Sequence, residues 1–258
     1  MNRMTGKTAI VTGGGPGIGA AIAARFAAEG ARVMIAEING PVGQATAASI
    51  ASQTGARVVA TTCDVADPGS VRAMVETTRS LFGPANVLVN NAGVAIFREP
   101  LEMTSDDWRR CMSVDLDGAW HCCQAVLPDM LEHRDGAIIN IISNHAFTVI
   151  KQTFPYPVAK HALLGLTRSL GLEYADRGIA VNAISPGYTD TQIAQNEFNR
   201  HPDPAAARAA IEAKQPPGRL CRPDEVAAVA VLLGSGEARF MIGENIVIDG
   251  GVSIRMYE

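Results

Sequence analysis

The stretch from Lys7 to Arg25 constrains the fold more than any other part of the chain. It reads KTAIVT, then GGGPGIG, then AAIAAR. The apolar run predicts a strand, the glycine-rich segment a tight turn, and the alanine-rich segment a helix. Glycines allow positive φ and close approach to a ligand, and a helix N-terminus offers free N–H groups, which suits a pyrophosphate. A tight turn that binds nothing is the alternative, so the rest of the chain must decide.

The composition argues against several classes of function. The chain has 258 residues, 47% of them hydrophobic and 19% charged, which is typical of a globular protein that folds as one domain. The net charge of −4 and the lack of a basic block argue against nucleic acid and anionic membranes as partners. There is no apolar run of about 18 residues and no signal-peptide pattern, so we expect a cytoplasmic protein.

The five cysteines predict neither a disulfide framework nor a metal site. Their number is odd and their spacing fits reduced thiols. Cys122 and Cys123 follow His121, but adjacent residues on a helix point about 100° apart, so one ion cannot bind all three side chains. We therefore expect no metal ion.

Apolar runs alternate with helical patterns along the rest of the chain. Predicted strands cover residues 30–37, 57–62, 87–89, 136–143, 179–185 and 243–251. Predicted helices cover 41–55, 70–82 and 156–174, and residues 104–131 carry one or two more. The apolar run 136–143 is typical of a buried central strand in a parallel sheet. Because open parallel sheets bind ligands beyond the carboxyl ends of their strands, residues at those ends are the candidates for binding.

Acids and amides follow three of these strands. Glu37 ends the second strand about 20 residues beyond the glycine turn, where a dinucleotide fold uses an acid to accept hydrogen bonds from the adenosine ribose. A solvated acid at a strand end is the alternative. Asp64 either accepts a hydrogen bond from the adenine amino group or caps the next helix. The small residues and amides of 90–93 suit a backbone pressed against a ribose.

In this order, the motifs resemble the short-chain dehydrogenase/reductase family. They are Thr12-Gly13-x-x-x-Gly17-x-Gly19, Glu37, Asp64-Val65 and Asn90-Asn91-Ala92-Gly93, and the match covers nearly the whole chain. The resemblance implies a single α/β, doubly wound Rossmann domain with a parallel sheet of about seven strands between helices. The family is commonly tetrameric, so a homotetramer is expected.

The resemblance also implies a nicotinamide cofactor. Glu37, with Pro16 in place of a basic residue, favours NAD over NADP because the acid would repel a 2′-phosphate. The implied cofactor-binding residues are Gly13, Gly15, Gly17, Ile18, Glu37, Asp64, Val65, Asn91, Ala92, Gly93, Tyr156, Lys160, Pro186, Gly187, Thr189 and Thr191. For the two threonines, an ordinary turn with helix caps is the alternative.

Ser143, Tyr156 and Lys160 are the predicted catalytic residues. Ser143 ends a strand, and Tyr156 and Lys160 lie one helical turn apart, so the phenol and the ammonium share a face. By resemblance, Ser143 binds the substrate oxygen, Tyr156 is the acid/base, and Lys160 lowers the phenol pKa and binds the ribose. Hydride transfer requires such a group, because a free phenol with a pKa near 10 is a poor base. A partly buried packing pair is the alternative for Tyr156 and Lys160.

Asp115 departs from the family pattern. It lies in Val114-Asp115-Leu116-Asp117-Gly118, where the family usually has Asn at the second position, and that amide normally supports a water relay near the catalytic lysine. We include Asp115 among the catalytic residues. An ionised Asp115 near Lys160 would stabilise the ammonium and weaken its effect on Tyr156. Alternatively, the carboxyl is protonated or turns away and caps local backbone.

Residues 192–218 are polar and interrupted by prolines, and they resemble the family's mobile substrate lid. Beside the nicotinamide, His145, Tyr188 and Gln192 are the predicted substrate-binding residues. Their hydrogen-bonding groups suit a sugar or another small polyhydroxylated substrate. For His145, a surface-loop position is the alternative.

The sequence therefore predicts an NAD-dependent oxidoreductase that transfers a hydride between nicotinamide and a secondary alcohol or carbonyl of a small polar substrate. Two alternatives remain at this point. One is a 3-oxoacyl-thioester reductase. The other is a dinucleotide-binding sensor without turnover, for which Asp115 would mark lost catalysis.

Overall fold

The computed structural model describes residues 2–256 and is built around one parallel sheet of seven strands. The strand order is β3-β2-β1-β4-β6-β8-β9. The strands are β1 (Thr8–Thr12), β2 (Arg32–Glu37), β3 (Val58–Thr62), β4 (Val87–Asn90), β6 (Gly136–Ile141), β8 (Ile179–Pro186) and β9 (Asn245–Ile248). The order reverses direction between β1 and β4, as in a doubly wound sheet, so the predicted fold class is confirmed.

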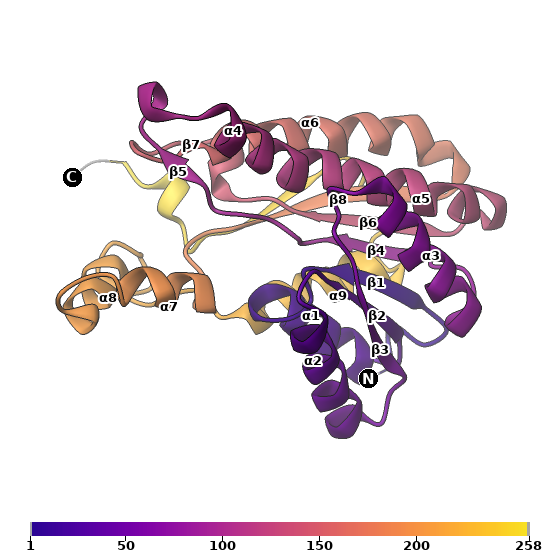
Figure 1. Cartoon of the computed structure of the whole chain (residues 1–258). Coiled ribbons are helices and arrows are strands. Elements are labelled where there is room, and N and C mark those ends of the chain that lie inside the picture. The colour runs from indigo at the N-terminus through magenta and orange to yellow at the C-terminus, as the bar shows by residue number, and fades with distance from the viewer. Residues whose placement is uncertain (1, 257–258) are drawn as a thin grey trace.

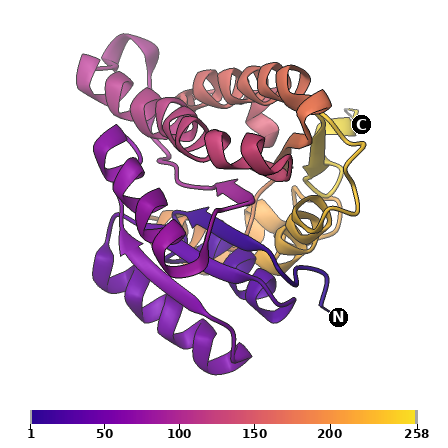
Figure 2. The same cartoon turned by 90° about the vertical axis from the view of Figure 1, so that its right-hand side faces the viewer.

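Helices cover both faces of the sheet (Figures 1 and 2). The helices are α1 (Gly17–Ala28), α2 (Gly40–Thr54), α3 (Pro68–Phe82), α4 (Ser105–Met112), α5 (Gly118–His133), α6 (Tyr156–Tyr174), α7 (Gln192–Phe198), α8 (Pro204–Glu212) and α9 (Pro223–Ser235). Side chains of α1, α2 and α9 pack on one face, and those of α3, α5 and α6 pack on the other.

The two faces arise from the alternation of side chains along each buried strand. Ala9 and Val11 of β1 join the cluster under α1, whereas Ile10 between them joins the cluster under α5. Cys122 and Cys123 belong to the second cluster and are fully buried, which accounts for these two thiols as packing residues. Nδ1 of the neighbouring His121 lies 3.0 Å from the Val65 carbonyl oxygen.

Three features were not resolved by the sequence patterns. Residues 104–131 form two helices joined by a π-helical turn, Ser113–Asp117. A two-stranded antiparallel ribbon of β5 (Phe97–Arg98) and β7 (Phe154–Pro155) lies apart from the main sheet. Short 3₁₀ helices at 100–102, 144–146, 175–177 and 252–254 lie in the connections. The predicted lid contains α7 and α8, which project from the body of the molecule in Figure 1.

Candidate active site

The glycine turn after β1 is held in place by the end of β4. Gly13 and Gly17 have φ of +60° and +66°, a region that favours glycine. A Cβ on Gly13 would lie 2.8 Å from the Ala92 Cα, so the turn and the segment after β4 are in direct contact. The Asn91 amide donates to the Thr12 and Gly13 carbonyl oxygens at 3.0 and 2.9 Å. The Asn91 side chain therefore supports the turn.

Glu37 faces the same turn from the end of β2. Its carboxylate accepts hydrogen bonds from the Gly15 and Asn39 N–H groups, both at 3.1 Å, and the residue is 8% exposed. This excludes a freely solvated acid at this position. The carboxylate lies where β1 and β2 end side by side, which places a negative charge at the predicted ribose end of the binding edge.

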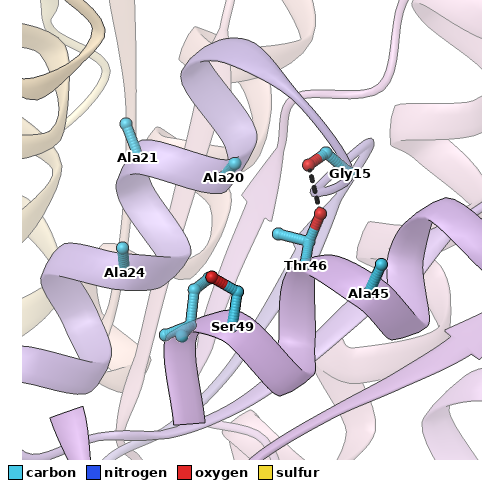
Figure 3. Close-up of a pocket in the computed structure, with 8 residues that line it drawn as sticks. Gly15, Ala20, Ala21, Ala24, Ala45, Thr46 and Ser49 are labelled. Carbon is cyan, nitrogen blue, oxygen red and sulfur yellow. Dashed lines mark hydrogen bonds between the residues drawn. The ribbon is translucent and has the colours of Figure 1, made fainter. Parts of the chain in front are cut away.

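An open hollow lies beside this turn, between α1 and α2 (Figure 3). Its volume is about 490 Å³, and small side chains line most of it. The Thr46 hydroxyl donates to the Gly15 carbonyl oxygen at 2.6 Å, which ties α2 to the turn (Figure 3). None of the predicted catalytic residues lines the hollow, so we attribute it to the packing of two alanine-rich helices.

The contacts of Asp64 test one of its two alternatives, the helix cap, whereas its contact with adenine stays a prediction. Asp67, rather than Asp64, caps α3, because its Oδ1 accepts from the Gly69 N–H at 2.8 Å. Asp64 instead accepts from the Ala66 N–H at 2.9 Å within its own loop. Val65 is 6% exposed and packs in the core. Ile18 lies at the start of α1 and packs against the core on the other face.

The structure brings the three predicted catalytic residues together. Tyr156 begins α6, and the Lys160 ammonium lies 5.4 Å from the centre of its ring. The ammonium also donates to the Ile141 carbonyl oxygen, at 3.4 Å, which ties it to the end of β6. Ser143 follows β6 and is 8% exposed; its hydroxyl donates to Asn144 Oδ1 at 3.3 Å and accepts from the His145 N–H at 3.1 Å.

Opposing effects act on the Tyr156 phenol. Burial raises the pKa of Tyr156 above its ordinary value of 10.0, the Lys160 ammonium lowers it, and the Asp115 carboxylate raises it. The Ser143 hydroxyl, which can donate to the phenolate, also lowers it. Burial opposes the charge on Lys160, but Asp115 and Tyr156 outweigh burial and raise the pKa of Lys160 above 10.5. Lys160 therefore stays a cation across the neutral range.

Asp115 lies in this cluster and contacts Lys160 directly. Its Oδ1 is 3.0 Å from the Lys160 Nζ, and its Oδ2 accepts from the Val94 N–H at 3.1 Å. The Asp115 side chain therefore contacts Lys160 and also accepts a hydrogen bond from local backbone. The sequence left these two contacts as alternatives, and the structure contains both. Val94 and Ile141 take part only through backbone atoms, so no side-chain pattern could have indicated them.

The segment after β8 joins the glycine turn to the predicted lid. Pro186 pairs with Ile248 of β9, and a Cβ on Gly187 would lie 2.8 Å from the Asp249 Cα. Thr189 is buried and donates to the Gly187 carbonyl oxygen at 3.0 Å. The Thr191 hydroxyl caps α7 by accepting from the Ala194 N–H at 3.4 Å. A Cβ on Gly17 would lie 3.4 Å from the Thr191 Cγ2, so the start of the lid borders the glycine turn.

Of the three predicted substrate-binding residues, His145 lies beside the Tyr156 phenol. Its ring is edge-on to that of Tyr156, with centroids 6.0 Å apart. Tyr188 stacks on Phe198 of α7 at 6.0 Å, and the Gln192 amide donates to Asn196 Oδ1 of the same helix at 2.9 Å. Tyr188 therefore contacts the predicted lid, and Gln192 lies at its start. Phe97, which the sequence analysis missed, packs edge-on against Tyr156 at 5.7 Å.

Within residues 2–256, no three His, Cys, Asp or Glu side chains gather in an arrangement that could bind a metal ion. The chemistry of the cluster is that of proton transfer: a phenol, a cation close to it, and a hydroxyl donor. This arrangement, at the carboxyl edge of a doubly wound sheet, is typical of a dinucleotide-dependent oxidoreductase.

Comparisons with known proteins agree with this class. A family model described as enoyl-(acyl carrier protein) reductase matches residues 13–253. D-threitol dehydrogenase of Mycolicibacterium smegmatis is 38% identical over 253 residues, which cover 98% of this chain and 95% of that protein. The chain belongs to the short-chain dehydrogenase/reductase family.

Solved structures show the same fold. The aldohexose dehydrogenase of Thermoplasma acidophilum, in ligand-free form, has a TM-score of 0.90 and 33% identity, and the match covers 100% of this chain and 98% of that one. The actinorhodin polyketide ketoreductase solved with NADPH has a TM-score of 0.93 and 30% identity, covering 98% of this chain and 99% of that one. The family binds a nicotinamide dinucleotide.

Proposed function

We propose that this protein is an NAD-dependent dehydrogenase that oxidises a secondary alcohol of a small polyhydroxylated substrate, a polyol or a sugar. The observation that carries the proposal is the meeting of Tyr156, Lys160 and Ser143 at the carboxyl edge of the sheet, with Lys160 5.4 Å from the Tyr156 ring. The glycine turn and Glu37 occupy the same edge, at the ends of β1 and β2.

Each side chain has a defined part in alcohol oxidation. Bound nicotinamide would accept the hydride from the carbinol carbon. Tyr156 takes the hydroxyl proton, Lys160 favours its phenolate form electrostatically, and Ser143 donates to the substrate oxygen as charge develops there. In the described structure the Ser143 hydroxyl donates to Asn144, so it must turn toward the substrate when one binds.

Glu37 supports the choice of NAD over NADP. Its carboxylate is fixed by the N–H groups of Gly15 and Asn39 and points its charge at the turn that would hold the pyrophosphate. Carboxylate oxygens are pure acceptors and suit ribose hydroxyls, whereas a 2′-phosphate would meet a like charge.

His145 supports a substrate with more than one hydroxyl. Its Nδ1 lies 3.3 Å from the Thr148 carbonyl oxygen, so Nδ1 carries the proton. Burial lowers the pKa of His145 below 6.5, which keeps the ring neutral and leaves Nε2 as an acceptor. An acceptor beside Tyr156 suits a second hydroxyl next to the reacting carbon. The names of two similar proteins, D-threitol dehydrogenase and aldohexose dehydrogenase, point to the same class of substrate.

The test is a substrate panel with both NAD and NADP, followed through the absorbance of the reduced cofactor. Tetritols, pentitols and aldoses should be oxidised with NAD. They should be oxidised faster than alcohols of the same chain length that carry one hydroxyl. Faster reduction of a 3-oxoacyl thioester would favour the thioester reductase. Cofactor binding without turnover of any substrate would favour the sensor.

The variant Tyr156→Phe checks the assignment of the acid/base. Turnover should fall by about 10²–10⁴-fold, the range of positioned acid–base catalysis, while NAD binding persists. Tyr174→Phe, a change in the last residue of the same helix, is the control and should leave turnover unchanged. A Tyr156→Phe protein that kept more than about a tenth of the activity would refute the role.

We also propose that residues 192–218 form a substrate lid. Thr191 at its start borders Gly17 of the glycine turn, and Arg208 of α8 binds Asp190 through two hydrogen bonds, at 2.8 and 3.3 Å. These contacts connect the segment to the cofactor edge at one end. Limited proteolysis should cleave it more slowly in the presence of NAD and substrate. Equal cleavage rates in both states would contradict closure.

We propose a cytoplasmic homotetramer. Large apolar side chains are exposed on α5 and α6 and after α9, at Trp120, Leu172 and Phe240, with exposed fractions of 38%, 82% and 103%. If subunits pack on these helices, the three side chains become buried, which supports the proposal. Among the described residues, every helix is too short or too polar to cross a membrane. Light scattering on the purified protein should give four times the chain mass of 27.1 kDa, and a monomer mass would contradict the assembly.

A further inference from the structure

Asp115 is the most deeply buried carboxylate among residues 2–256. It is 1% exposed and lies in the π-helical turn Ser113–Asp117, between α4 and α5. Its Oδ1 is 3.0 Å from the Lys160 Nζ, in an ion-pair contact without an aligned hydrogen bond, and the two side chains are 0% and 5% exposed. A carboxylate this deeply buried is costly unless it is paired, so the contact with Lys160 is what keeps it in place.

Gly93 packs so closely against Asp115 and Lys160 that a residue with a Cβ would not fit in its place. A Cβ on Gly93 would lie 2.7 Å from the Asp115 Oδ1 and 3.5 Å from the Lys160 Nζ. The next residue, Val94, donates its N–H to the Asp115 Oδ2 at 3.1 Å. The segment after β4 therefore accommodates one carboxylate oxygen and binds the other. Both oxygens have fixed positions relative to the ammonium.

We propose that Asp115 is a positioning residue that acts on Tyr156 through Lys160, holding the ammonium in place while its own negative charge offsets part of the ammonium's field at the phenol. The result is an enzyme whose alcohol oxidation is fastest at alkaline pH. The inference rests on the proposed role of Tyr156 as proton acceptor.

The titratable groups around the phenol decide the direction of the effect. Lys160 lowers the pKa of Tyr156 and Asp115 raises it. Cys111 of α4 lies 4.0 Å from the Asp115 Oδ2, and burial raises the pKa of its thiol to about 11, so it is neutral near pH 7. His145, on the other side of the ring, stays neutral because burial lowers its pKa. Cys111 and His145 therefore add no charge to this cluster at neutral pH.

The variant Asp115→Asn removes the charge and keeps the size of the side chain. Its amide oxygen can face the Lys160 ammonium and keep that contact, while its NH2 group takes the place of the oxygen that accepts from the Val94 N–H. Without the negative charge, the Lys160 field at the phenol is less opposed, so the phenolate forms at lower pH. Because oxidation requires the phenolate, the acidic limb of the kcat profile should move to lower pH by about one unit, with KM for the alcohol little changed.

The matched control is Asp117→Asn, because Asp117 ends the same π-helical turn and is exposed. Its profile should match that of the unchanged protein. A purely structural role for Asp115 would lower kcat at every pH without moving the limb. An acidic limb that stayed in place, or moved to higher pH, in the Asp115→Asn protein would overturn the proposal.

A second measurement is independent of turnover. The chain has four tyrosines, so the difference between the ultraviolet phenolate titrations of the unchanged protein and of Tyr156→Phe reports Tyr156 alone. The same difference measured in the Asp115→Asn background should show a lower pKa for Tyr156. If Tyr156→Phe remains active, the proposed function fails; if it is inactive but the titration does not move, only the inference about Asp115 fails.

Discussion

Glu37 and Asp115 are buried carboxylates at two places along the same edge of the sheet, and their local surroundings are alike. Each accepts a backbone N–H from a neighbouring loop: Glu37 from Gly15 and Asp115 from Val94, both at 3.1 Å. Each also lies against a glycine, because a Cβ on Gly15 would be 2.8 Å from the Glu37 Oε2, and one on Gly93 would be 2.7 Å from the Asp115 Oδ1.

Their partners differ. Asp115 pairs with Lys160 at 3.0 Å, whereas the hydrogen bonds that Glu37 accepts within residues 2–256 come from the backbone N–H groups of Gly15 and Asn39 and not from a cation. An unpaired carboxylate acts on what enters the site, because its charge is not offset nearby. A paired carboxylate instead changes the electrostatic effect of its cation on a third group, here the effect of Lys160 on the Tyr156 phenol. We infer that Glu37 selects among cofactors, whereas Asp115 adjusts the acidity of a catalytic residue.

Among the changes that test this comparison of the two carboxylates, the largest effect is expected on the selectivity between NAD and NADP. Glu37→Gln keeps the side-chain length and removes the charge, so it should weaken NAD binding and narrow the gap between NAD and NADP. Because hydrogen bonds to charged groups contribute about 1.5–3 kcal/mol, the ratio of the two dissociation constants should change by about tenfold to a hundredfold. Fluorescence titration with each cofactor measures both constants.

Asp115→Asn is the matched control for that measurement, because it removes the paired charge and should leave the cofactor ratio unchanged. Tighter binding of NADP than of NAD by the unchanged protein would refute the role of Glu37. An equal change of the ratio in both variants would show that the two carboxylates do not have separate roles.

Much of the fold could be predicted because each strand is a short apolar run that ends in a turn, and Glu37 could be placed because it ends such a run. The contacts that the two carboxylates make could not be predicted from the sequence. Glu37 meets Gly15 through a backbone N–H, and Asp115 meets Val94 in the same way, so neither partner leaves a side-chain pattern. The direction of Asp115 depends on the π-helical turn, which adds a residue to the helical repeat and has no clear sequence signal.

Asn91 shows the same limit at the other strand end. Residues 90–93 are predicted to press their backbone against a ribose, which stays a prediction, but the contact of the Asn91 side chain was not foreseen: its amide donates to the Thr12 and Gly13 carbonyl oxygens and supports the glycine turn. Phe97 lies beside Tyr156 because β5 pairs with β7, and Arg98 of β5 is paired with Phe154 of β7. These two strands are far apart in the sequence, so the contact of Phe97 could not be predicted. Long-range pairing of two-residue strands is not visible in local periodicity.

An intermediate effect is expected for Gly93→Ala. The new Cβ would lie 2.7 Å from the Asp115 Oδ1, and Asp115 cannot easily move because Val94 holds its other oxygen. Overpacking of this kind costs about 1–3 kcal/mol, so kcat should fall by about tenfold and the thermal midpoint should drop. Gly165→Ala is the control: Gly165 lies in α6 with nothing within 4 Å of an added Cβ. Equal kcat in the Gly93 and Gly165 variants would contradict the tight fit of the ion pair.

The smallest effect is expected for Gly15→Ala, although the clash looks similar. The added Cβ would lie 2.8 Å from the Glu37 Oε2 and 3.0 Å from the Val42 Cγ1, but both are ends of side chains, and Glu37 has more rotatable bonds than Asp115. Glu37 can shift by a few tenths of an ångström and weaken its hydrogen bond to Gly15 without breaking it, which loses only part of the about 1.5–3 kcal/mol that a hydrogen bond to a charged group contributes. We therefore expect NAD binding to weaken by about threefold to fivefold, with kcat at saturating NAD unchanged. Isothermal titration of NAD and steady-state kinetics measure the two quantities separately. If kcat of Gly15→Ala fell as much as that of Gly93→Ala, Glu37 would be held as rigidly as Asp115. The two carboxylates would then not differ in their freedom to move.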